Sequence, residues 1–421
     1  MKIVVIGSGL IGLTCAYVLR RQGHEITVID RAEGAGRETS FANGSLLTPS
    51  MSEPWNTPGC WRTLLGSLGN SDSALQLRLR ALPSLASWGV TFLRNSGHAA
   101  FERNTRSNLR LALYSLRVLQ LLLQQTGIEY GRSARGSLKI FRDYASLDRT
   151  VAAAARLQSD GLGFRRLSRD QTIEFEPALG PIASTLVGGI HYGADETGDA
   201  YRFCIALAEH NRHDGVQFRF RTEVTELVTH SGAVTAVVCG RERFVADQYV
   251  LATASYSTPL LRRVGVHLPV QPAKGYSVTF NDRQGKPSLN LPVIDDSLHA
   301  AIVPLQGVLR VAGTAEFAGF DRTLDQSRIR NLAKLVQSVL PQGALDPETA
   351  IPWCGLRAMS ADGVPIIGPT PVSNLLVNSG HGHLGWTMAA GSAQLLADLI
   401  SGDSPAIDPE PYALRRFGLA R

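Results

Sequence analysis

Three glycines near the N-terminus have the spacing of a loop that binds a dinucleotide. Residues 7–12 are Gly-Ser-Gly-Leu-Ile-Gly, and Asp30 follows eighteen residues after the last of these glycines. In such a loop Gly7 allows a tight turn, Gly9 lets the backbone approach a pyrophosphate, and Gly12 lets a helix pack closely on a strand. The Asp30 carboxylate would accept hydrogen bonds from the adenosine ribose, and it disfavours a cofactor with a 2′-phosphate. The loop does not distinguish FAD from NAD, because both contain the same ADP half.

The flanking residues supply the elements that would position this loop. The apolar run 3–6 is typical of a strand buried on both faces, 13–21 predicts a helix, and 26–29 predicts a second strand. A pyrophosphate would rest at the N-terminus of the helix, where free N–H groups and the helix dipole favour negative charge. A glycine-rich turn without a ligand is the alternative, which the combination of strand, helix and acid disfavours. The predicted cofactor-binding residues of this unit are Gly7, Ser8, Gly9, Leu10, Ile11, Gly12, Asp30 and Arg31.

Two further segments indicate a second half of the cofactor. Residues 38–45 form a small polar loop that is placed to return under the cofactor, although such a loop is often only a surface turn. Residues 380–387 (Gly-His-Gly-His-Leu-Gly-Trp-Thr) precede a helix predicted over 388–400 and follow a strand predicted over 375–378. A helix N-terminus there would stabilise the negative charge of a reduced flavin near N1 and the C2 carbonyl. The two loops therefore favour FAD, with predicted contacts from Ser40, Asn43, Gly44, Gly382, Leu384, Gly385 and Thr387.

Several segments resemble the FAD-dependent amine oxidoreductases of the D-amino acid oxidase and glycine oxidase superfamily, and within it the bacterial D-amino acid dehydrogenases. The likeness runs essentially from end to end, and 38–44 and 380–388 are its most specific parts. The chain differs from the family at Ala358, where proline is usual, at Ala254, where glycine is common, and over 45–49, a region that faces the substrate. The segments that carry the resemblance are 7–12, 38–44 (Glu-Thr-Ser-Phe-Ala-Asn-Gly), 255–261, 274–277 (Lys-Gly-Tyr-Ser) and 380–388.

The resemblance implies a mixed α/β (α+β) fold, in which a Rossmann-type FAD-binding domain carries an inserted substrate domain built on an antiparallel sheet. We expect the FAD-binding domain over 1–75, 196–264 and 346–421, and the substrate domain over 76–195 and 265–345. By the same resemblance, the backbone of Val224 would contact the adenine. Apolar patterns predict helices over 108–125, 152–156, 202–210 and 326–340, and strands over 218–221, 222–228, 234–238, 249–253, 269–280, 300–304 and 307–313.

Oxidation of an amino acid at Cα needs a group that binds the carboxylate, an uncharged amine, and a Cα–H directed at flavin N5. Arg357 is the catalytic candidate for the carboxylate, because a guanidinium pairs with a carboxylate through two hydrogen bonds. This assignment is implied mainly by the resemblance, since many other arginines occur and a structural or surface arginine is the alternative. Tyr276 would add a hydroxyl donor, and His381 or His383 would hydrogen-bond flavin or substrate, although each has a plain structural alternative. No supported Ser-His-Asp triad, metal cluster or carboxylate pair occurs, as expected if the flavin supplies the chemistry.

The expected reaction is hydride transfer from Cα of a D-amino acid to flavin N5, followed by hydrolysis of the imino acid to a 2-oxo acid and ammonia. The electrons would pass to a quinone or another electron carrier rather than to NAD. Three alternatives stay open: an oxygen-using oxidase, a dehydrogenase of D-hydroxyproline or another cyclic imino acid, and a non-catalytic FAD-binding subunit of a complex.

The overall composition limits the partners of the chain. The 421 residues (45.4 kDa) are 44% hydrophobic and 19% charged, which excludes a disordered or fibrous protein. The net charge of +6 (42 − 36) comes from dispersed arginine pairs, which argues against nucleic acid and leaves peripheral contact at an anionic inner membrane open. Five scattered cysteines lack metal-site or disulfide spacing and favour a reducing compartment such as the cytoplasm. No stretch reaches the roughly 18 to 20 apolar residues of a membrane span. Partner subunits stay open.

Overall fold

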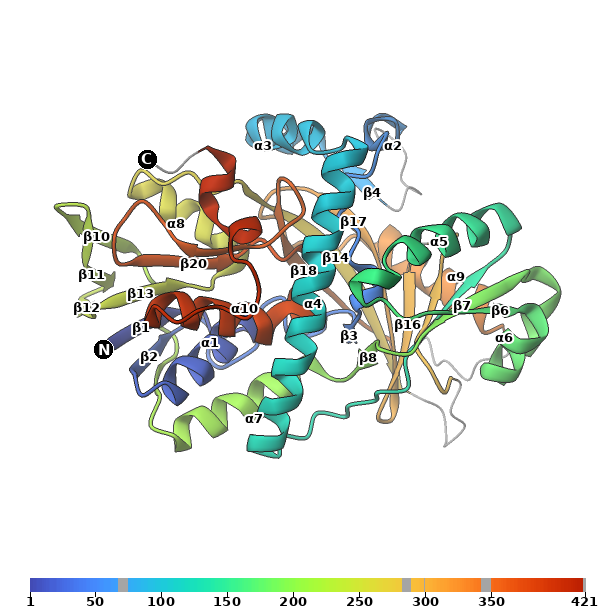
Figure 1. The fold of residues 1–421 in the computed structure, drawn as a ribbon, viewed down its shortest axis with the longest axis horizontal. Helices are drawn as coiled ribbons and strands as arrows, with labels where there is room; N and C mark the ends of the chain where they lie inside the picture. Colours follow the sequence, from blue (N-terminus) through green and yellow to red (C-terminus); the bar gives the residue numbers. More distant parts are fainter. Residues whose placement is uncertain (67–74, 282–288, 299, 342–349, 419–421) are drawn as a thin grey trace.

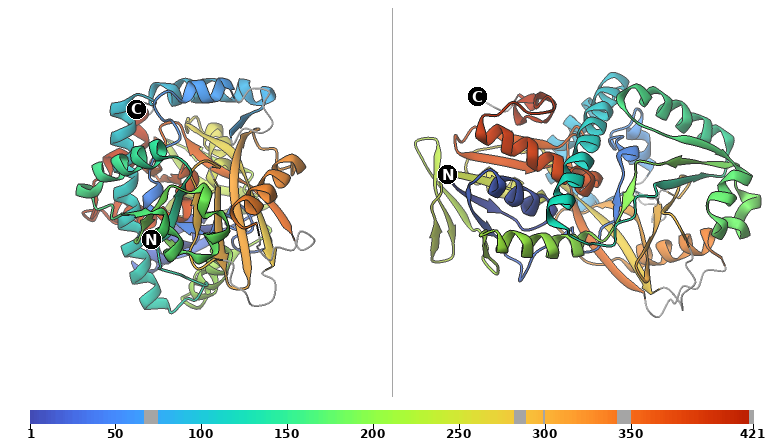
Figure 2. Two further views of the ribbon diagram at one scale, coloured as in Figure 1. Left: turned by 90° about the vertical axis from the view of Figure 1, so that its right-hand side faces the viewer. Right: turned by 60° about the horizontal axis from the view of Figure 1, so that its bottom comes forward.

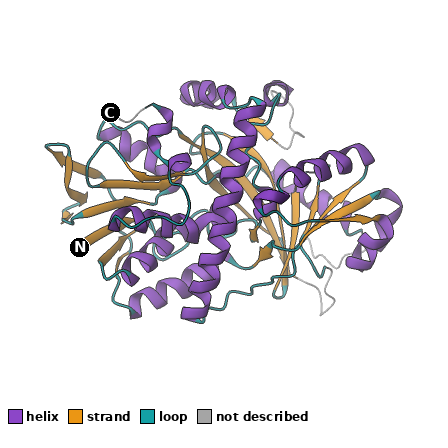
Figure 3. Cartoon of the chain, viewed as in Figure 1, coloured by secondary structure: helices purple, strands orange, loops and turns teal. Residues whose placement is uncertain are grey.

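Two large β-sheets lie on either side of one long helix. The computed structural model describes residues 1–66, 75–281, 289–298, 300–341 and 350–418. Figure 1 shows the helix α4 (His98–Thr126) crossing the middle of the molecule, with a parallel sheet on one side and a second, larger sheet on the other. Figure 3 shows the same division by secondary structure, with strands in orange on both sides of α4.

The first sheet has six strands, and β1 lies in its interior. The strand order is β19-β20-β13-β1-β2-β9, and every neighbouring pair is parallel except β19 with β20. This arrangement explains why the sequence over 3–6 and 26–29 is continuously apolar, because parallel strands of this kind are covered on both faces. The strands are β1 (Lys2–Ile6), β2 (Glu25–Ile29), β9 (Gln217–Arg219), β13 (Gln248–Leu251), β19 (Ile366–Pro369) and β20 (Leu375–Ser379).

Alternate residues of β1 enter two different cores. Ile3 and Val5 pack with the helices α1 (Leu10–Arg21), α7 (Ala200–His213) and α10 (Gly385–Ser401). Figure 2 shows α1 between α10 and α7 on this face. Val4 and Ile6 face the opposite way. Their cover consists of α8 (Ser257–Arg263) and a three-stranded sheet of β10 (Glu226–His230), β11 (Ala233–Cys239) and β12 (Glu242–Phe244).

The second sheet has nine strands and is mostly antiparallel. Its order is β18-β14-β17-β16-β15-β5-β7-β6, with β4 paired to β17, and only the pairs β15–β5 and β17–β4 are parallel. The amphipathic helix α9 (Gln326–Val339) packs on one face through Leu332, Val336 and Val339. The strands are β4 (Leu75–Leu77), β5 (Ser137–Phe141), β6 (Arg165–Ser168), β7 (Gly188–Tyr192), β14 (Val270–Asn281), β15 (Val293–Asp295), β16 (Ala300–Leu305), β17 (Val308–Phe317) and β18 (Ile351–Ser360).

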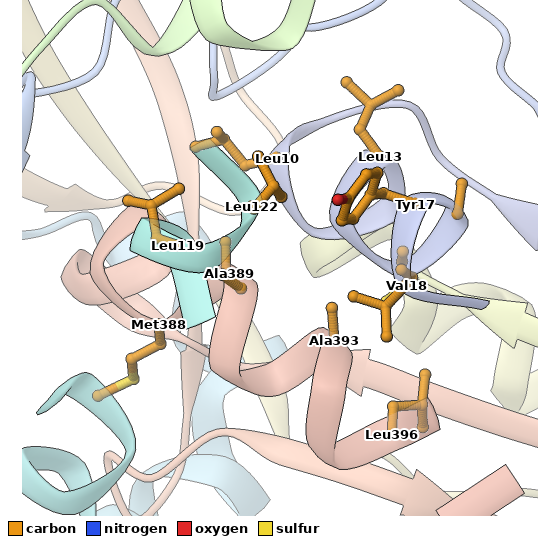
Figure 4. Packing of buried hydrophobic residues seen from close by; sticks show 14 of the residues in the cluster. Leu10, Leu13, Tyr17, Val18, Leu119, Leu122, Met388, Ala389, Ala393 and Leu396 are labelled. Atoms are coloured by element: carbon orange, nitrogen blue, oxygen red, sulfur yellow. The ribbon is translucent and has the colours of Figure 1, made fainter. Parts of the chain in front are cut away.

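The helix α4 joins the two halves through both apolar and polar contacts. Leu119 and Leu122 enter the core shared by α1 and α10, as Figure 4 shows. Gly391 of α10 lies so close to α4 that a Cβ there would be 2.8 Å from the Cα of Ser115, which requires a glycine. The helix begins ten residues before the predicted start at 108, because its first turns carry polar side chains and lack an apolar stripe. One of these, Asn104, donates to the backbone carbonyl of Asp362 at 2.9 Å.

The predicted fold class is confirmed, since a Rossmann-like parallel sheet and a separate, mostly antiparallel sheet are both present. The strand β18, predicted within the FAD-binding part, is hydrogen-bonded to β14 in the nine-stranded sheet. The exact domain bounds stay a prediction. Among the described residues, no helix has both the length and the apolar character that a membrane crossing requires. The other elements are α2 (Cys60–Gly66), α3 (Leu82–Arg94), α5 (Tyr144–Arg156), α6 (Arg169–Phe175), β3 (Leu46–Leu47), β8 (Glu196–Thr197), and the 3₁₀ helices η1 (Pro49–Met51) and η7 (Gly382–Leu384).

Candidate active site

One large cavity is lined by residues of both sheets and has a volume of about 1150 Å³. Its walls include segments from both ends of the chain, which the fold brings together. The predicted site residues that line it are Gly7, Gly9, Leu10, Ile11, Asp30, Arg31, Ser40, Asn43, Gly44, Val224, Tyr276, Arg357, His381, Gly382 and Gly385.

The N-terminal loop is built so that only glycine fits at its key positions. Gly7 has a positive φ of 108°, and a Cβ there would lie 2.6 Å from the carbonyl oxygen of Ala252. A Cβ on Gly12 would overlap the carbonyl of Gly7. Gly9 is the N-cap of α1 and offers no side chain, and the helix N-terminus opens on the cavity through Gly9, Leu10 and Ile11. The amide of Leu10 donates to Ser40 Oγ at 3.2 Å. The positive end of the helix dipole is therefore directed at the cavity.

Asp30 stands at the C-terminal end of β2 and is already held in place. One carboxylate oxygen accepts hydrogen bonds from the amide of Ser8 at 2.6 Å and from its hydroxyl at 2.7 Å, and the other accepts from the amide of Ala32 at 2.8 Å. Next to it, the Arg31 guanidinium lies 4.0 Å from the centre of the Tyr256 ring. Ser8 thus supports Asp30 and is not part of the cavity wall.

A second helix N-terminus opens on the same cavity. The turn η7 contains Gly382 and leads into α10, which begins at Gly385 without a side-chain cap. The two helices contact each other, since Thr14 Oγ1 of α1 donates to the carbonyl of Ala389 of α10 at 3.3 Å. Figure 4 shows the apolar side chains of both helices in the same core. Thr387 accepts a hydrogen bond from the amide of Thr48 at 2.9 Å and so ties α10 to the segment after the polar loop. Four of the predicted cofactor-binding residues lie behind the cavity wall rather than in it: Ser8, Gly12, Leu384 and Thr387.

Arg357 is a partly buried cation that faces the cavity. It lies on β18 against Gly275 of β14, where any larger residue would overlap the guanidinium. Its one hydrogen bond among the described residues is long, 3.5 Å to the carbonyl of Thr314, and no carboxylate of the described chain pairs with it. Burial without a compensating anion lowers the pKa of Arg357 to about 10. The accessible part of its side chain faces the cavity, and this is the arrangement of a receptor for an anionic group.

The two histidines near α10 are neutral at neutral pH. His381 Nε2 lies 2.9 Å from Ser392 Oγ, and desolvation lowers the pKa of this imidazole to about 3. His383 Nε2 lies 2.9 Å from the carbonyl oxygen of Met51, and desolvation lowers its pKa to about 4. The His383 ring stacks on Trp55, with ring centres 5.7 Å apart. Neither ring adds positive charge to this end of the cavity.

Comparison with known proteins identifies the family. A family model described as "FAD dependent oxidoreductase" (DAO) matches residues 2–399. The chain is 41% identical to the D-amino acid dehydrogenase of Paramagnetospirillum magneticum, over 99% of each chain, and 40% identical to that of Sinorhizobium medicae, over 99% of this chain and 100% of the relative. The chain belongs to the DAO family. Among solved structures, glycine oxidase from Geobacillus kaustophilus has the same fold, with a TM-score of 0.77 over 99% of each chain at 22% identity.

The cavity of this DAO family member fits FAD. Two helix N-termini flank the cavity, the glycines at positions 7 and 12 leave no room for a side chain, and Asp30 ends the strand next to the first loop. These features suit an elongated anionic dinucleotide, with the ADP half at α1 and the flavin half toward α10 and the second sheet. The family membership confirms the predicted FAD cofactor. The individual contacts, including that of Val224, stay predictions.

The side chain of Tyr276, a predicted site residue of this DAO protein, points away from Arg357. The Tyr276 side chain is 1% exposed and its hydroxyl donates to Glu316 Oε2 at 2.7 Å, in a buried cluster with Lys274. Side chains alternate along β14, so Gly275 lies next to Arg357 while Tyr276 faces the α9 core. The geometry therefore does not support the expected hydrogen bond from this hydroxyl to a carboxylate at Arg357.

The residues that line the cavity but were not predicted from the sequence include Trp55 and Met51, which contact other candidate site residues. Trp55 has the Arg357 guanidinium carbon 5.9 Å from its ring centre and His383 stacked on it, and Met51 accepts the His383 hydrogen bond. Both lie in the segment after β3, Met51 at the end of the short helix η1 and Trp55 beyond it, where no periodic pattern marks a functional residue. The only sequence feature that marks this region is the difference between residues 45–49 and the usual form of the family.

Proposed function

We propose that this protein is an FAD-dependent D-amino acid dehydrogenase that oxidatively deaminates D-amino acids to 2-oxo acids and ammonia, by hydride transfer from Cα to flavin N5. The observation that carries the proposal is Arg357, a partly buried guanidinium without a carboxylate partner in the described chain, which faces the cavity that fits FAD. The relatives that are 40–41% identical over nearly their whole length are D-amino acid dehydrogenases, which supports the same activity.

The chain's own residues would prepare the substrate in three ways. Arg357 would bind the carboxylate through paired hydrogen bonds and fix the position of Cα. The neutral histidines would avoid repelling the substrate amine, because protonated imidazoles would add positive charge next to it. The N-terminus of α10 would favour negative charge on the cofactor side of the cavity. Bound FAD supplies the acceptor for the two electrons that leave Cα.

The electrons would then pass to a quinone or another electron carrier. We place the protein in the cytoplasm, with peripheral contact at the inner membrane. The five buried free cysteines and the net charge of +6 support this placement, because thiols persist in a reducing compartment and basic proteins are attracted to anionic lipid.

The decisive experiment is anaerobic reduction of the purified flavoprotein. Bleaching of the flavin absorbance by D-alanine or D-methionine, and not by the L-isomers, would support the proposal. Preferential bleaching by D-proline or D-hydroxyproline would replace it with a cyclic imino acid dehydrogenase. Release of one peroxide per turnover in air would identify an oxidase. Failure of every amine to bleach a flavin that dithionite reduces would indicate a non-catalytic flavin-binding subunit.

A further inference from the structure

His383 has a fixed proton position. Its Nε2 lies 2.9 Å from the backbone carbonyl of Met51, and a carbonyl oxygen can only accept a hydrogen bond. The neutral imidazole therefore carries its proton on Nε2, and its Nδ1 is a hydrogen-bond acceptor. No residue of the described chain donates to Nδ1, and His383 lines the cavity.

The Met51 carbonyl, which sets this tautomer, belongs to a segment that side-chain hydrogen bonds anchor. Ser50, the residue before it in η1, donates its hydroxyl to the buried carboxylate of Asp195 at 2.6 Å and its amide at 3.2 Å. Asp195 also accepts from the hydroxyl of Ser137 at 2.6 Å. These bonds anchor η1, so the orientation of the His383 ring is fixed by backbone rather than by a mobile side chain.

His383 lies close to the candidate carboxylate-binding residue. The Trp55 ring contacts both groups, with the His383 ring centre at 5.7 Å and the Arg357 guanidinium carbon at 5.9 Å from its own centre. The charge of Arg357 also contributes to the low pKa of His383, which requires the two to be near each other. An α-amino acid carries its carboxylate and its amine on the same carbon atom, so a ligand with its carboxylate on Arg357 has its amine in this neighbourhood.

We propose that His383 is the residue that binds the substrate amine, by accepting a hydrogen bond from it through Nδ1. This inference rests on the proposed function and deepens it, because it names the second point of attachment. Arg357 and His383 together would fix two of the four substituents of Cα. With the flavin on one side of Cα as the third fixed position, only the enantiomer whose hydrogen is directed at flavin N5 would react.

The proposal is tested with a pair of ligands that differ by the amine alone, D-alanine and propionate. We expect His383→Phe, which keeps a ring on Trp55 but has no acceptor, to lower kcat/KM for D-alanine roughly 10- to 100-fold. The same variant should change the dissociation constant of propionate, measured by the flavin difference spectrum of the holoenzyme, less than threefold. Equal losses for both ligands, or no loss for either, would overturn the proposal.

Two further variants separate amine binding from support of the backbone. His383→Asn places an amide where Nδ1 lies, whereas His383→Gln places one where Nε2 lies and keeps a donor for Met51. Amine binding predicts that Asn restores more D-alanine activity than Gln, and a purely structural role predicts the reverse order. Retention of the flavin spectrum confirms that each variant is folded. Failure of the wild-type flavin to react with any D-amino acid would refute the proposed function itself, whereas full D-alanine activity in His383→Phe would refute only the role of the histidine.

Discussion

Replacement of Arg357 by methionine should make the protein more stable and much less active. The pKa of Arg357 is lowered to about 10 from 12.5, and each unit of pKa corresponds to about 1.4 kcal/mol. The fold therefore disfavours this charge by roughly 3 kcal/mol, and at neutral pH the whole of this cost is present because the guanidinium stays protonated. Methionine fills a similar volume without charge, so the free energy of unfolding of the ligand-free holoenzyme should rise by up to about 3 kcal/mol.

The activity should change in the opposite direction. A buried carboxylate–guanidinium pair that loses one partner costs about 3 to 5 kcal/mol, which corresponds to a fall in kcat/KM of roughly 150- to 5,000-fold. Thermal unfolding of the holoenzyme in a carboxylate-free buffer measures the first effect, which should appear as an upward shift of Tm by roughly 3 to 6 °C. Steady-state turnover of D-alanine with an artificial electron acceptor measures the second.

Two controls make the result specific. Arg357→Lys keeps the charge but loses the paired geometry, so it should weaken activity without raising Tm. Arg243→Met removes an exposed arginine of β12, away from the cavity, and should change neither quantity. A loss of stability in Arg357→Met with kcat/KM unchanged would refute the reasoning. It would mean that Arg357 stabilises the fold and does not bind the substrate carboxylate.

Three other substitutions test the remaining parts of the site. Gly12→Ala would force a Cβ into the Gly7 carbonyl and should leave a protein without bound flavin after gel filtration, whereas Gly34→Ala, with open space around it, should keep its yellow colour. Burial raises the pKa of Asp195 to about 6, so the native state binds the proton of this carboxyl more tightly than the unfolded state does. The stabilisation that this group contributes is complete below about pH 4 and is lost as the pH rises through 6. Asp195→Asn should reduce the fall in unfolding free energy between pH 4 and 6 by roughly 3 kcal/mol in urea titrations, and parallel pH profiles would contradict this. Tyr276→Phe should keep kcat/KM within twofold and cost about 1 to 2 kcal/mol of stability, because the hydroxyl bonds a buried carboxylate and not the substrate; a large rise in KM would restore its predicted role.

Much of the cofactor-binding half could be predicted from the sequence, because local rules determine it. The spacing of the glycines, the apolar strand before them and the acid after the second strand together indicate one local arrangement of the backbone. The first loop and Asp30 could therefore be located from the residues alone. The boundaries were less accurate. The helix α1 begins at Leu10 instead of 13, since Gly12 belongs to its first turn, and 222–225 is not part of a strand, as β10 begins only at Glu226.

The substrate side was harder to predict, because long-range contacts create it. Arg357 was found mainly through the resemblance, and its defining property is that no carboxylate of the described chain pairs with it, which no sequence pattern expresses. Tyr276 was misplaced because the face of a strand depends on its register, and a shift of one residue reverses every side chain. Trp55 and Met51 come from the segment after β3 and gain their roles only through packing against β18 and η7.

The position of β1 in the interior of its sheet also governs when the protein can acquire its cofactor during biosynthesis. Strand β1 is translated first, yet its neighbour β13 and the helix α10 that packs on α1 leave the ribosome hundreds of residues later. Until then the apolar faces of β1 and α1 lack part of the cover that they have in the folded protein, and exposed apolar surface of this kind favours aggregation. The two helix N-termini that flank the cavity can therefore come together only after α10, near the C-terminal end of the described chain, has been synthesised.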